Sequence, residues 1–259
     1  MFVHDRHQAI LDHLRKRPRL SVDALLREMP VSRSTLRRDL VALERRRSVI
    51  RVHGGVMRRD VAQEEPTFER RRGEHEDEKR AIARIAADMV PDQAAVYLDA
   101  GTTTLRVAEA LLPRRKLRLF THSLRLMNLA STGHAAITCL GGEHRPGSDA
   151  LVGHLTVKWL DNLRFDVALM AASGVSLEGA FTTELSECSV KQRIMQRSAK
   201  IILVCDSSKW NGSAAVRFAD WKEFDAWVCD VGLAAAARQC ARRHGVRVEL
   251  AGQQVGVSP

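Results

Sequence analysis

The chain has 259 residues, 45% of them hydrophobic, and a formal net charge of +10. This length fits one large domain, or a small domain joined to a larger one. It contains no run of 18 apolar residues, and its first residues lack the basic-then-apolar pattern of a signal peptide, so we expect no membrane span and no secretion. Five scattered cysteines without a CxxC pair indicate reduced thiols in a cytoplasmic protein, not a disulfide or zinc framework.

The positive charge is concentrated at one end of the chain. Residues 1–59 hold fifteen Lys and Arg against six Asp and Glu, whereas the other 200 residues hold 26 against 25. A basic module joined to a nearly neutral one predicts a polyanionic partner for the first part alone.

The basic part begins with two predicted helices. Residues 5–17 carry an apolar stripe at helical spacing, and Pro18 stops it. Ser21 is placed to cap a second helix, whose apolar residues over 22–29 recur at helical spacing. Pro30 and the residue after it then form a turn.

A third helix and a small hairpin follow this turn. Ser32 can cap the helix, in which Leu36, Leu40 and Leu43 form a narrow apolar stripe. Residues 49–53 are typical of a strand, and Gly54-Gly55 lead into a return strand from Val56. Three helices and a hairpin in this order predict a winged helix-turn-helix domain over residues 1–57.

The third helix carries the residues expected to contact DNA. In a helix-turn-helix the second helix of the motif lies in the major groove, where Arg can bridge guanine O6 and N7 and hydroxyls can hold phosphates. With the leucines facing the core, Arg38 and Arg45 fall on the opposite face. A solvated basic helix is the alternative, but it leaves the capped helix, turn and wing unexplained. The predicted DNA-contacting residues are Ser32, Arg33, Ser34, Thr35, Arg37, Arg38, Arg51 and His53.

The rest of the chain alternates between predicted helices and strands. Residues 58–77 are highly charged with little periodicity, which predicts a linker, in part helical. This alternation predicts an α/β domain with a mainly parallel sheet over residues 78–252. We expect helices at 78–90, 103–112, 124–131, 152–163, 184–198 and 232–242, and strands at 95–99, 117–121, 136–140, 166–171, 200–205, 226–229 and 246–250.

Residues 98–104 read LDAGTTT between a predicted strand and a predicted helix. A glycine followed by hydroxyls at a helix N-terminus offers free N–H groups, a favourable dipole and OH donors to a phosphate. Asp99 would repel phosphate, so its better role is a hydrogen bond to a sugar hydroxyl. A strand-to-helix turn capped by Thr accounts for the same residues, and both interpretations stay open. The sequence contains no GxGxxG pattern, and we predict no cofactor site and no metal site.

These motifs resemble the DeoR-type bacterial transcription regulators. In the basic part, VSRSTLRRDL (31–40), Leu43-Glu44 and RVHGG (51–55) match the family signature, with Arg47 where the family usually has Gly. Across residues 78–230 the chain resembles the family's effector domain through Asp99 to Thr103 (its DSGTT loop), Thr121-His122-Ser123 (its TNS), Leu140-Gly141-Gly142, Gly179 to Lys191, and Asp206 to Lys209 (its DxSK).

The resemblance implies a sugar-isomerase-like fold that senses phosphorylated sugars, with Gly101 to Thr104 holding phosphate and Lys209 as a cationic partner. It predicts these effector-binding residues: Asp99, Gly101, Thr102, Thr103, Thr104, Gly141, Gly142, Lys191, Asp206 and Lys209. Two alternatives stay open: Glu187 and Lys191, four residues apart, could form a surface salt bridge, and Gly141-Gly142 could be a simple turn.

The expected function is a sequence-specific transcription regulator, in this family most often a repressor of carbohydrate-metabolism genes controlled by a phosphorylated sugar. Its expected partners are a double-stranded DNA operator, the effector and a second copy of the chain, because half-sites are read by symmetric oligomers. The alternative is a sugar-phosphate isomerase with a DNA-binding appendage. An isomerase needs a carboxylate base, and the stretch 170–175 (MAASGV), which corresponds to the acidic cluster of related isomerases, has none, so we expect no enzyme activity. A constitutive DNA binder that only oligomerises is a third, weaker possibility.

Overall fold

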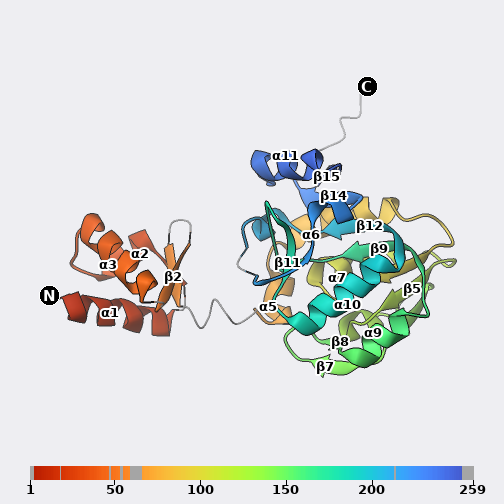
Figure 1. Cartoon of the computed structure of the whole chain (residues 1–259), viewed down its shortest axis with the longest axis horizontal. Coiled ribbons are helices and arrows are strands. Elements are labelled where there is room, and N and C mark those ends of the chain that lie inside the picture. The colour runs from red at the N-terminus through yellow and green to blue at the C-terminus, as the bar shows by residue number, and fades with distance from the viewer. Residues whose placement is uncertain are drawn as a thin grey trace. The chain divides into compact units, whose positions relative to one another are not determined.

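The structure is a computed structural model that describes residues 3–17, 19–46, 48–52, 55–58, 66–212 and 214–252 (Figure 1). The chain divides into two compact units, Met1–Glu65 and Pro66–Pro259.

The N-terminal unit is a winged helix-turn-helix, as predicted. It contains helices α1 (Val3–Lys16), α2 (Val22–Glu28) and α3 (Arg33–Arg45) and an antiparallel sheet in the order β1 (Arg19–Ser21), β3 (Gly55–Arg58), β2 (Val49–Val52). Strand β1 was not predicted. Ser21 and Ser32 cap α2 and α3 as expected, because their hydroxyls accept hydrogen bonds from Ala24 N at 3.1 Å and Thr35 N at 3.2 Å. The predicted apolar stripe of α3 is buried in the core of this unit.

Gly55 has a packing role in this unit. A Cβ at this position would lie 2.6 Å from the carbonyl oxygen of Leu20, so only glycine lets β3 approach β1 this closely. Arg47, which precedes the predicted wing, and His53 and Gly54, which belong to it, lie outside the described residues.

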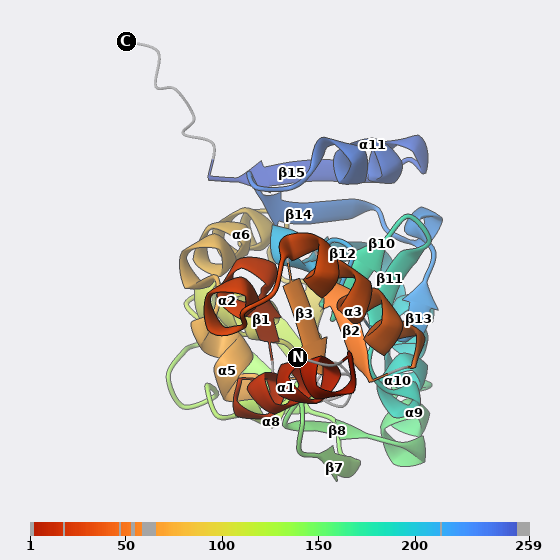
Figure 2. The same ribbon diagram turned by 90° about the vertical axis from the view of Figure 1, so that its left-hand side faces the viewer.

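The C-terminal unit is built on a seven-stranded sheet in which all neighbouring strands are parallel. Figure 2 shows β14 and β15 at one end of it, beside α11. In spatial order the strands are β15 (Arg247–Ala251), β14 (Ala226–Asp230), β12 (Ser198–Val204), β9 (Phe165–Met170), β4 (Ala95–Leu98), β5 (Arg118–Thr121) and β6 (Ala136–Cys139).

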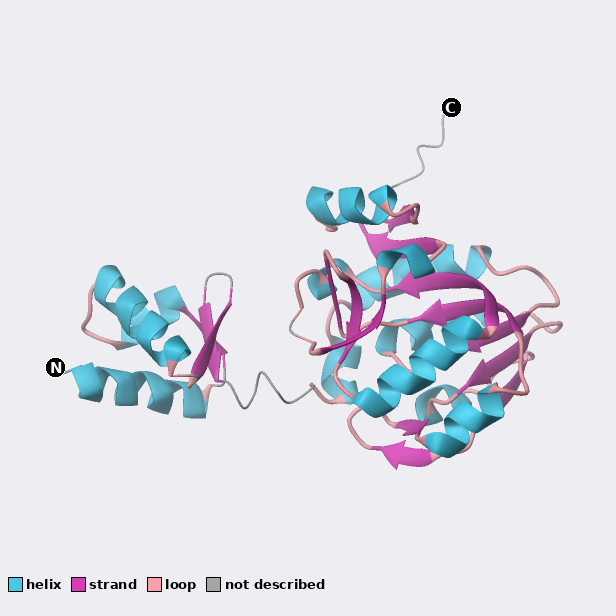
Figure 3. Ribbon diagram, in the orientation of Figure 1, coloured by secondary structure: helices cyan, strands magenta, loops and turns pink. Residues whose placement is uncertain are grey.

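Helices cover both faces of this sheet (Figure 3). One face is packed by α5 (Phe68–Gly73), α6 (Glu76–Asp88), α7 (Thr102–Leu111) and α8 (Leu124–Met127), and the other by α9 (His154–Leu160), α10 (Leu185–Gln196) and α11 (Ala235–Arg243). Successive side chains of a strand point to opposite sides of the sheet, and both sides are covered by helices. Consecutive residues of these strands are therefore apolar. In β4, Val96 and Leu98 join the core with α6 and α7, whereas Tyr97 joins the core with α10.

Several short elements were not predicted. They are the antiparallel sheet β10 (Gly174–Ser176), β11 (Gly179–Thr182), β13 (Val216–Ala219), the hairpin β7 (Glu143–Arg145) and β8 (Ala150–Val152), and the 3-10 turns η1 (Ser207–Lys209) and η2 (Trp221–Glu223). The helix predicted at 152–163 is therefore shorter, because β8 occupies its first residue. The helix predicted at 124–131 ends at Met127.

The predicted linker is also shorter than expected. The second compact unit begins at Pro66, and α5 lies inside the range 58–77. Helix α5 has the charged sequence FERRRG, but its first residue is buried. Phe68 is only 3% exposed and packs in the core with α6 and α7. Residues 66–77 thus belong to the C-terminal unit, where the ring of Phe68 is buried and Lys79 donates hydrogen bonds to the carbonyls of Arg71 and Glu74.

The strand order places a switch point between β4 and β9. From β4 the chain moves outward through β5 and β6, and it then returns to β9 and continues outward on the other side. Open parallel sheets bind ligands at the carboxyl ends of the strands flanking such a point. We call the loops at the carboxyl ends of β4, β5, β9 and β12 the sensor edge.

Candidate functional site

The outer face of α3 is the candidate DNA-binding surface. Ser34, Arg37, Arg38, Arg45 and Arg46 are exposed and line one shallow surface of this helix. The buried leucine stripe lies on the opposite side, as the spacing predicted. This face offers guanidinium groups that can reach bases and phosphates.

Two predicted DNA-contacting residues at the start of α3 already have partners. The Ser32 hydroxyl caps the helix and lies 3.0 Å from Ser34 Oγ and 2.8 Å from Thr35 Oγ1. The exposed guanidinium of Arg33 forms an ion pair with Asp23 of α2. Ser32 therefore organises the N-terminus of the helix. The side chain of Arg51 lies outside the described residues.

A partly buried ion pair joins α3 to α1, and it was not predicted from the sequence. Asp39 is 4% exposed and receives two hydrogen bonds from Arg6 of α1, at 2.8 and 2.9 Å, while His7 Nε2 lies 3.3 Å away. The hydrogen bond from Arg6 lowers the pKa of Asp39. The signal was present: Asp39 follows Leu36 by three residues and precedes Leu43 by four, so it shares the buried stripe.

In the C-terminal unit the predicted phosphate loop lies at the N-terminus of α7. Gly101 is the N-cap residue, with extended backbone angles and no side-chain cap. A Cβ here would lie 2.7 Å from the Cβ of Ala171, so glycine is required by the close approach of the β4 and β9 loops. The hydroxyls of Thr102 and Thr103 have no partner among the described residues. The buried Thr104 hydroxyl donates to the carbonyl of Asp99 at 2.6 Å and is used internally.

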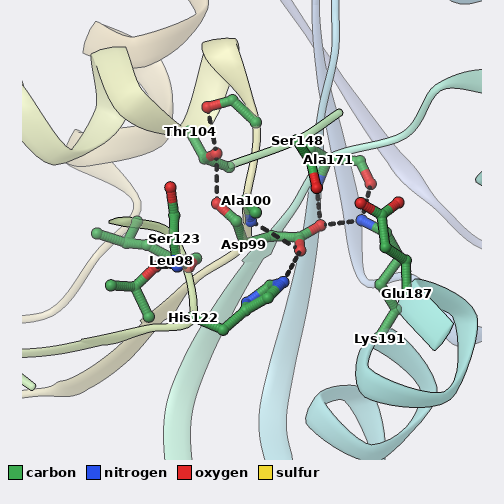
Figure 4. Close-up of polar contacts among 12 residues, drawn as sticks. Leu98, Asp99, Ala100, Thr104, His122, Ser123, Ser148, Ala171, Glu187 and Lys191 are labelled. Carbon is green, nitrogen blue, oxygen red and sulfur yellow. Dashed lines mark hydrogen bonds and ion pairs between the residues drawn. The ribbon is translucent and has the colours of Figure 1, made fainter. Parts of the chain in front are cut away.

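Asp99 bridges the switch point (Figure 4). It is fully buried, and its carboxylate accepts hydrogen bonds from Ala100 N and Ala171 N, both at 2.9 Å, and from the ammonium of Lys191. Lys191 also donates to the Ala171 carbonyl at 3.0 Å and lies 5.1 Å from the ring centre of Phe218. Asp99 and Lys191 were predicted to contact the effector, and in the structure they join β4, β9 and α10.

His122 completes this cluster from the end of β5. Its Nδ1 lies 2.8 Å from the Tyr97 hydroxyl and its Nε2 lies 3.8 Å from Asp99 Oδ1. Burial lowers the pKa of His122, although the Asp99 carboxylate acts in the opposite direction. The imidazole is therefore kept neutral at the sensor edge.

Glu187 and Lys191 do not form a surface salt bridge, so that alternative is wrong. Both are buried, and they have different partners. Glu187 accepts hydrogen bonds from Arg145 at 2.9 Å and from Thr182 at 2.6 Å. Burial alone would raise the pKa of Glu187, but Lys191 and Arg145 outweigh it and lower the pKa. Glu187 and Lys191 lie one turn apart on α10, as their spacing predicted. They do not pair with each other, because this side of α10 faces the sheet.

The remaining predicted effector residues have mixed surroundings. Asp206 caps η1 through Oδ1, while its Oδ2 is buried without a hydrogen-bond partner among the described residues. Lys209 is half-buried on the same turn. Gly142 has a packing role, because a Cβ there would lie 2.0 Å from Thr156 Oγ1, whereas Gly141 has open space around it.

One buried cation near this turn was missed by the sequence analysis. Lys79 of α6 is 2% exposed, and its ammonium donates to the carbonyls of Arg71 and Glu74. Burial lowers the pKa of Lys79, while the carboxylate of Asp206 raises it and Lys209 lowers it further. Lys79 fell in the charged stretch around the predicted linker, where a buried lysine has no distinguishing pattern.

Comparison with known proteins assigns the two units. Residues 6–61 match the DeoR-like helix-turn-helix domain, and residues 74–231 match the DeoR C-terminal sensor domain. The chain belongs to the DeoR family of transcription regulators. The resemblance inferred from the motifs is thereby confirmed, and the chain is a regulator, not an enzyme.

The relatives match along nearly their whole length. A helix-turn-helix transcription regulator of Haemophilus influenzae is 32% identical, over 96% of this chain and 97% of its own. The glycerol-3-phosphate regulon repressor of Escherichia coli is 29% identical, over 95% of this chain and 98% of its own. Among solved structures, ribose 5-phosphate isomerase A of Methanocaldococcus jannaschii overlaps at a TM-score of 0.39 and 17% identity, over 52% of this chain and 54% of its own.

The described residues contain neither a membrane-spanning helix nor a metal-binding cluster. No helix there is both long and apolar enough to cross a membrane. Those residues also contain no group of three or more His, Cys, Asp or Glu placed to hold a metal ion. The five cysteines are free thiols.

Proposed function

We propose that this DeoR-family regulator is a cytoplasmic repressor of carbohydrate-metabolism genes whose operator affinity is controlled by a phosphorylated sugar bound at the sensor edge. The observation that carries the proposal is the N-terminus of α7. There Thr102 and Thr103 present hydroxyls without partners, beside first-turn N–H groups that have no side-chain cap. Such an end attracts anions through its N–H groups and its dipole.

The surrounding charges support an anionic effector. Asp99, the one carboxylate in the loop itself, is neutralised by Lys191 and by backbone N–H groups, so it repels a phosphate less than its sequence position suggests. Lys209 and the buried Lys79 supply positive charge near the end of β12. The curated relatives include a repressor named for the glycerol-3-phosphate regulon, which is consistent with this class of effector.

The DNA arm of the proposal rests on the exposed arginine face of α3. Ser34, Arg37, Arg38, Arg51 and His53 are proposed to reach the operator, with Ser32 and Thr35 ordering the start of the helix. A symmetric dimer or higher oligomer is proposed because two half-sites need two such helices.

A thermal-shift screen tests the effector. The full chain is melted with glycerol 3-phosphate, ribose 5-phosphate and fructose 6-phosphate, and with each unphosphorylated parent. We expect one phosphorylated compound to raise the melting temperature and its parent to have no effect. Thr102→Val should abolish the shift, whereas Thr132→Val, at an exposed threonine in the turn after α8, should leave it unchanged.

A binding measurement then tests control. A duplex selected from a random pool by the full chain is titrated by fluorescence anisotropy, with and without the compound that shifts melting. An operator affinity that no phosphosugar alters would refute the proposed control and favour a constitutive DNA binder.

A further inference from the structure

Helix α5 is the first element of the C-terminal unit after the segment that leads from the DNA-binding unit. Its Phe68 ring lies close to two guanidinium groups, with Arg71 at 6.0 Å and Arg125 at 5.3 Å from the ring centre. Such cation–π contacts add to the burial of the ring. Because Arg125 belongs to α8, which directly follows the loop 121–123 of the sensor edge, α5 is held by a neighbour of that edge.

Arg125 joins α5 to the β7–β8 hairpin. Its Nη1 lies 2.9 Å from Glu69 Oε1 of α5, and its Nε lies 2.5 Å from Asp149 Oδ2 of the hairpin turn. Arg71 of α5 makes a parallel contact, donating to the carbonyl of Gly147 at 3.2 Å. Two arginines thus connect the same short helix to the same turn.

The turn 147–149 has a second side, which faces the sensor edge. Ser148, between the two residues that hold α5, is buried and accepts a hydrogen bond from Arg145 at 3.0 Å, and Arg145 binds Glu187. The Ser148 side chain also hydrogen-bonds the Glu187 carboxylate.

The backbone also ties this hairpin to the loop after β5. Leu124 N donates to the Asp149 carbonyl at 3.0 Å, and Leu151 N donates to the His122 carbonyl at 2.7 Å. A displacement at the sensor edge therefore reaches the turn directly, through both side chains and main chain.

We propose that Arg125 is a positioning residue that transmits effector occupancy from the turn 147–149 to α5, and so to the segment that leads to the DNA-binding unit. The inference rests on the proposed function. An effector bound against the sensor edge shifts Ser148 and with it Asp149, and Arg125 carries this shift to Glu69 and Phe68. The required differential contact is the ion pair between Arg125 and Asp149, which one arrangement of the turn makes and the other does not.

Arg125→Met tests this role, because methionine keeps apolar contact with Phe68 and removes both ion pairs. The matched control is Arg193→Met, since Arg193 pairs with Asp161 between α9 and α10 and its side chain is 35% exposed, against 37% for Arg125. Operator affinity of the full chain is measured with and without the most stabilising of the three phosphosugars. The dissociation constant of that phosphosugar is measured separately by calorimetry.

In the wild-type chain and in Arg193→Met we expect the phosphosugar to change operator affinity by ~5–150-fold, the usual range of such coupling. In Arg125→Met we expect less than about a twofold change, while the phosphosugar still binds with a dissociation constant within about threefold of wild type. Glu69→Gln removes the ion pair with Arg125 and leaves the contact between Arg125 and Asp149 in place, so it should give an intermediate response. Because the hairpin keeps its contact with Arg125, this variant is the control for misfolding of the hairpin.

The outcomes separate the two proposals. If the wild-type chain does not respond to any of the three compounds, the proposed function fails and the role of Arg125 fails with it. If the wild-type chain responds and Arg125→Met responds equally, only the role of Arg125 is overturned. Equal loss of response in Arg125→Met and Arg193→Met would also overturn it, because the effect would then not depend on α5.

Discussion

Gly101→Ala should destabilise the C-terminal unit through a single methyl group. The backbone angles of Gly101 are extended and suit any residue, so the whole effect comes from the added Cβ, 2.7 Å from the Cβ of Ala171 and 3.2 Å from Thr104 Oγ1. Carbon atoms in contact normally lie ~3.5–4.0 Å apart, which leaves the new methyl about 1 Å too close. Neither neighbour can yield easily, because Ala171 is held at its N–H by Asp99 and at its carbonyl by Lys191.

Overpacking of this kind costs ~1–3 kcal/mol, and the rigid surroundings favour about 2 kcal/mol. A domain of this size loses ~2–4 °C of melting temperature per kcal/mol, so we expect a fall of about 4–8 °C by scanning calorimetry. Gly73→Ala is the matched control, because a Cβ there has nothing within 4 Å, and this variant should melt at or slightly above wild type.

The double variant decides whether the methyl contact is the cause. Ala171→Gly removes the opposing Cβ, so in the Gly101→Ala background it should recover at least about 1 kcal/mol, as a favourable interaction energy in a double-mutant cycle. If Gly101→Ala melts with wild type, or if Ala171→Gly gives only additive losses, the close approach of the two loops is not what demands glycine here.

Three further predictions concern named side chains. Asp39→Ala removes the carboxylate that accepts two hydrogen bonds from Arg6 and should lower the denaturation midpoint of the N-terminal unit and weaken operator binding; an unchanged midpoint would contradict this. Burial lowers the pKa of His122 in the folded state, so the neutral side chain contributes its full share of folding stability above the unfolded pKa of ~6.5. This stability is lost as the pH falls below about 6.5 towards the lower pKa of the folded state. His122→Asn should therefore flatten the fall in melting temperature between about pH 7 and 5, and an unchanged slope would exclude this role. Arg38→Ala should lose ~1–3 kcal/mol of sequence discrimination, whereas Arg46→Ala should mainly reduce the salt slope by about one unit; equal losses on selected and random DNA for both would show that the facing of α3 is misassigned.

The fold was predictable where periodicity and capping agree. Ser21, Ser32 and the leucines of α3 define the winged helix-turn-helix because each local signal points to the same structure. The parallel sheet followed from apolar strands alternating with helices. Strands of three residues such as β7 and β10 carry too little pattern to be detected, and the packing of α5 into the C-terminal unit was not predicted because its one buried phenylalanine lies among charged residues.

The position of the candidate site was predictable from the sequence, but its side-chain contacts were not. The motifs located the loops at the carboxyl ends of β4, β5 and β12, where the structure has them. Which carboxylate meets which cation depends on tertiary packing: Lys191 binds Asp99, 92 residues away, and Glu187 binds Arg145, 42 residues away. Local spacing could not reveal these pairs, because a helix that packs against a sheet presents its charged residues to distant loops.

The use of Asp99 and Lys191 to join strand ends has a consequence for how this sensor can diversify. The two charged residues have a structural role, since Asp99 accepts a hydrogen bond from Ala171 N after β9 and Lys191 of α10 binds both Asp99 and the Ala171 carbonyl. In the proposed function, effector recognition falls to the hydroxyls of Thr102 and Thr103, which make no hydrogen bond among the described residues. Conservative substitutions at these two positions are then expected to change ligand preference while the contacts of Asp99 and Lys191 stay in place. This division of roles also marks those two threonines as the positions to randomise when the chain is to be retuned as a biosensor for another metabolite.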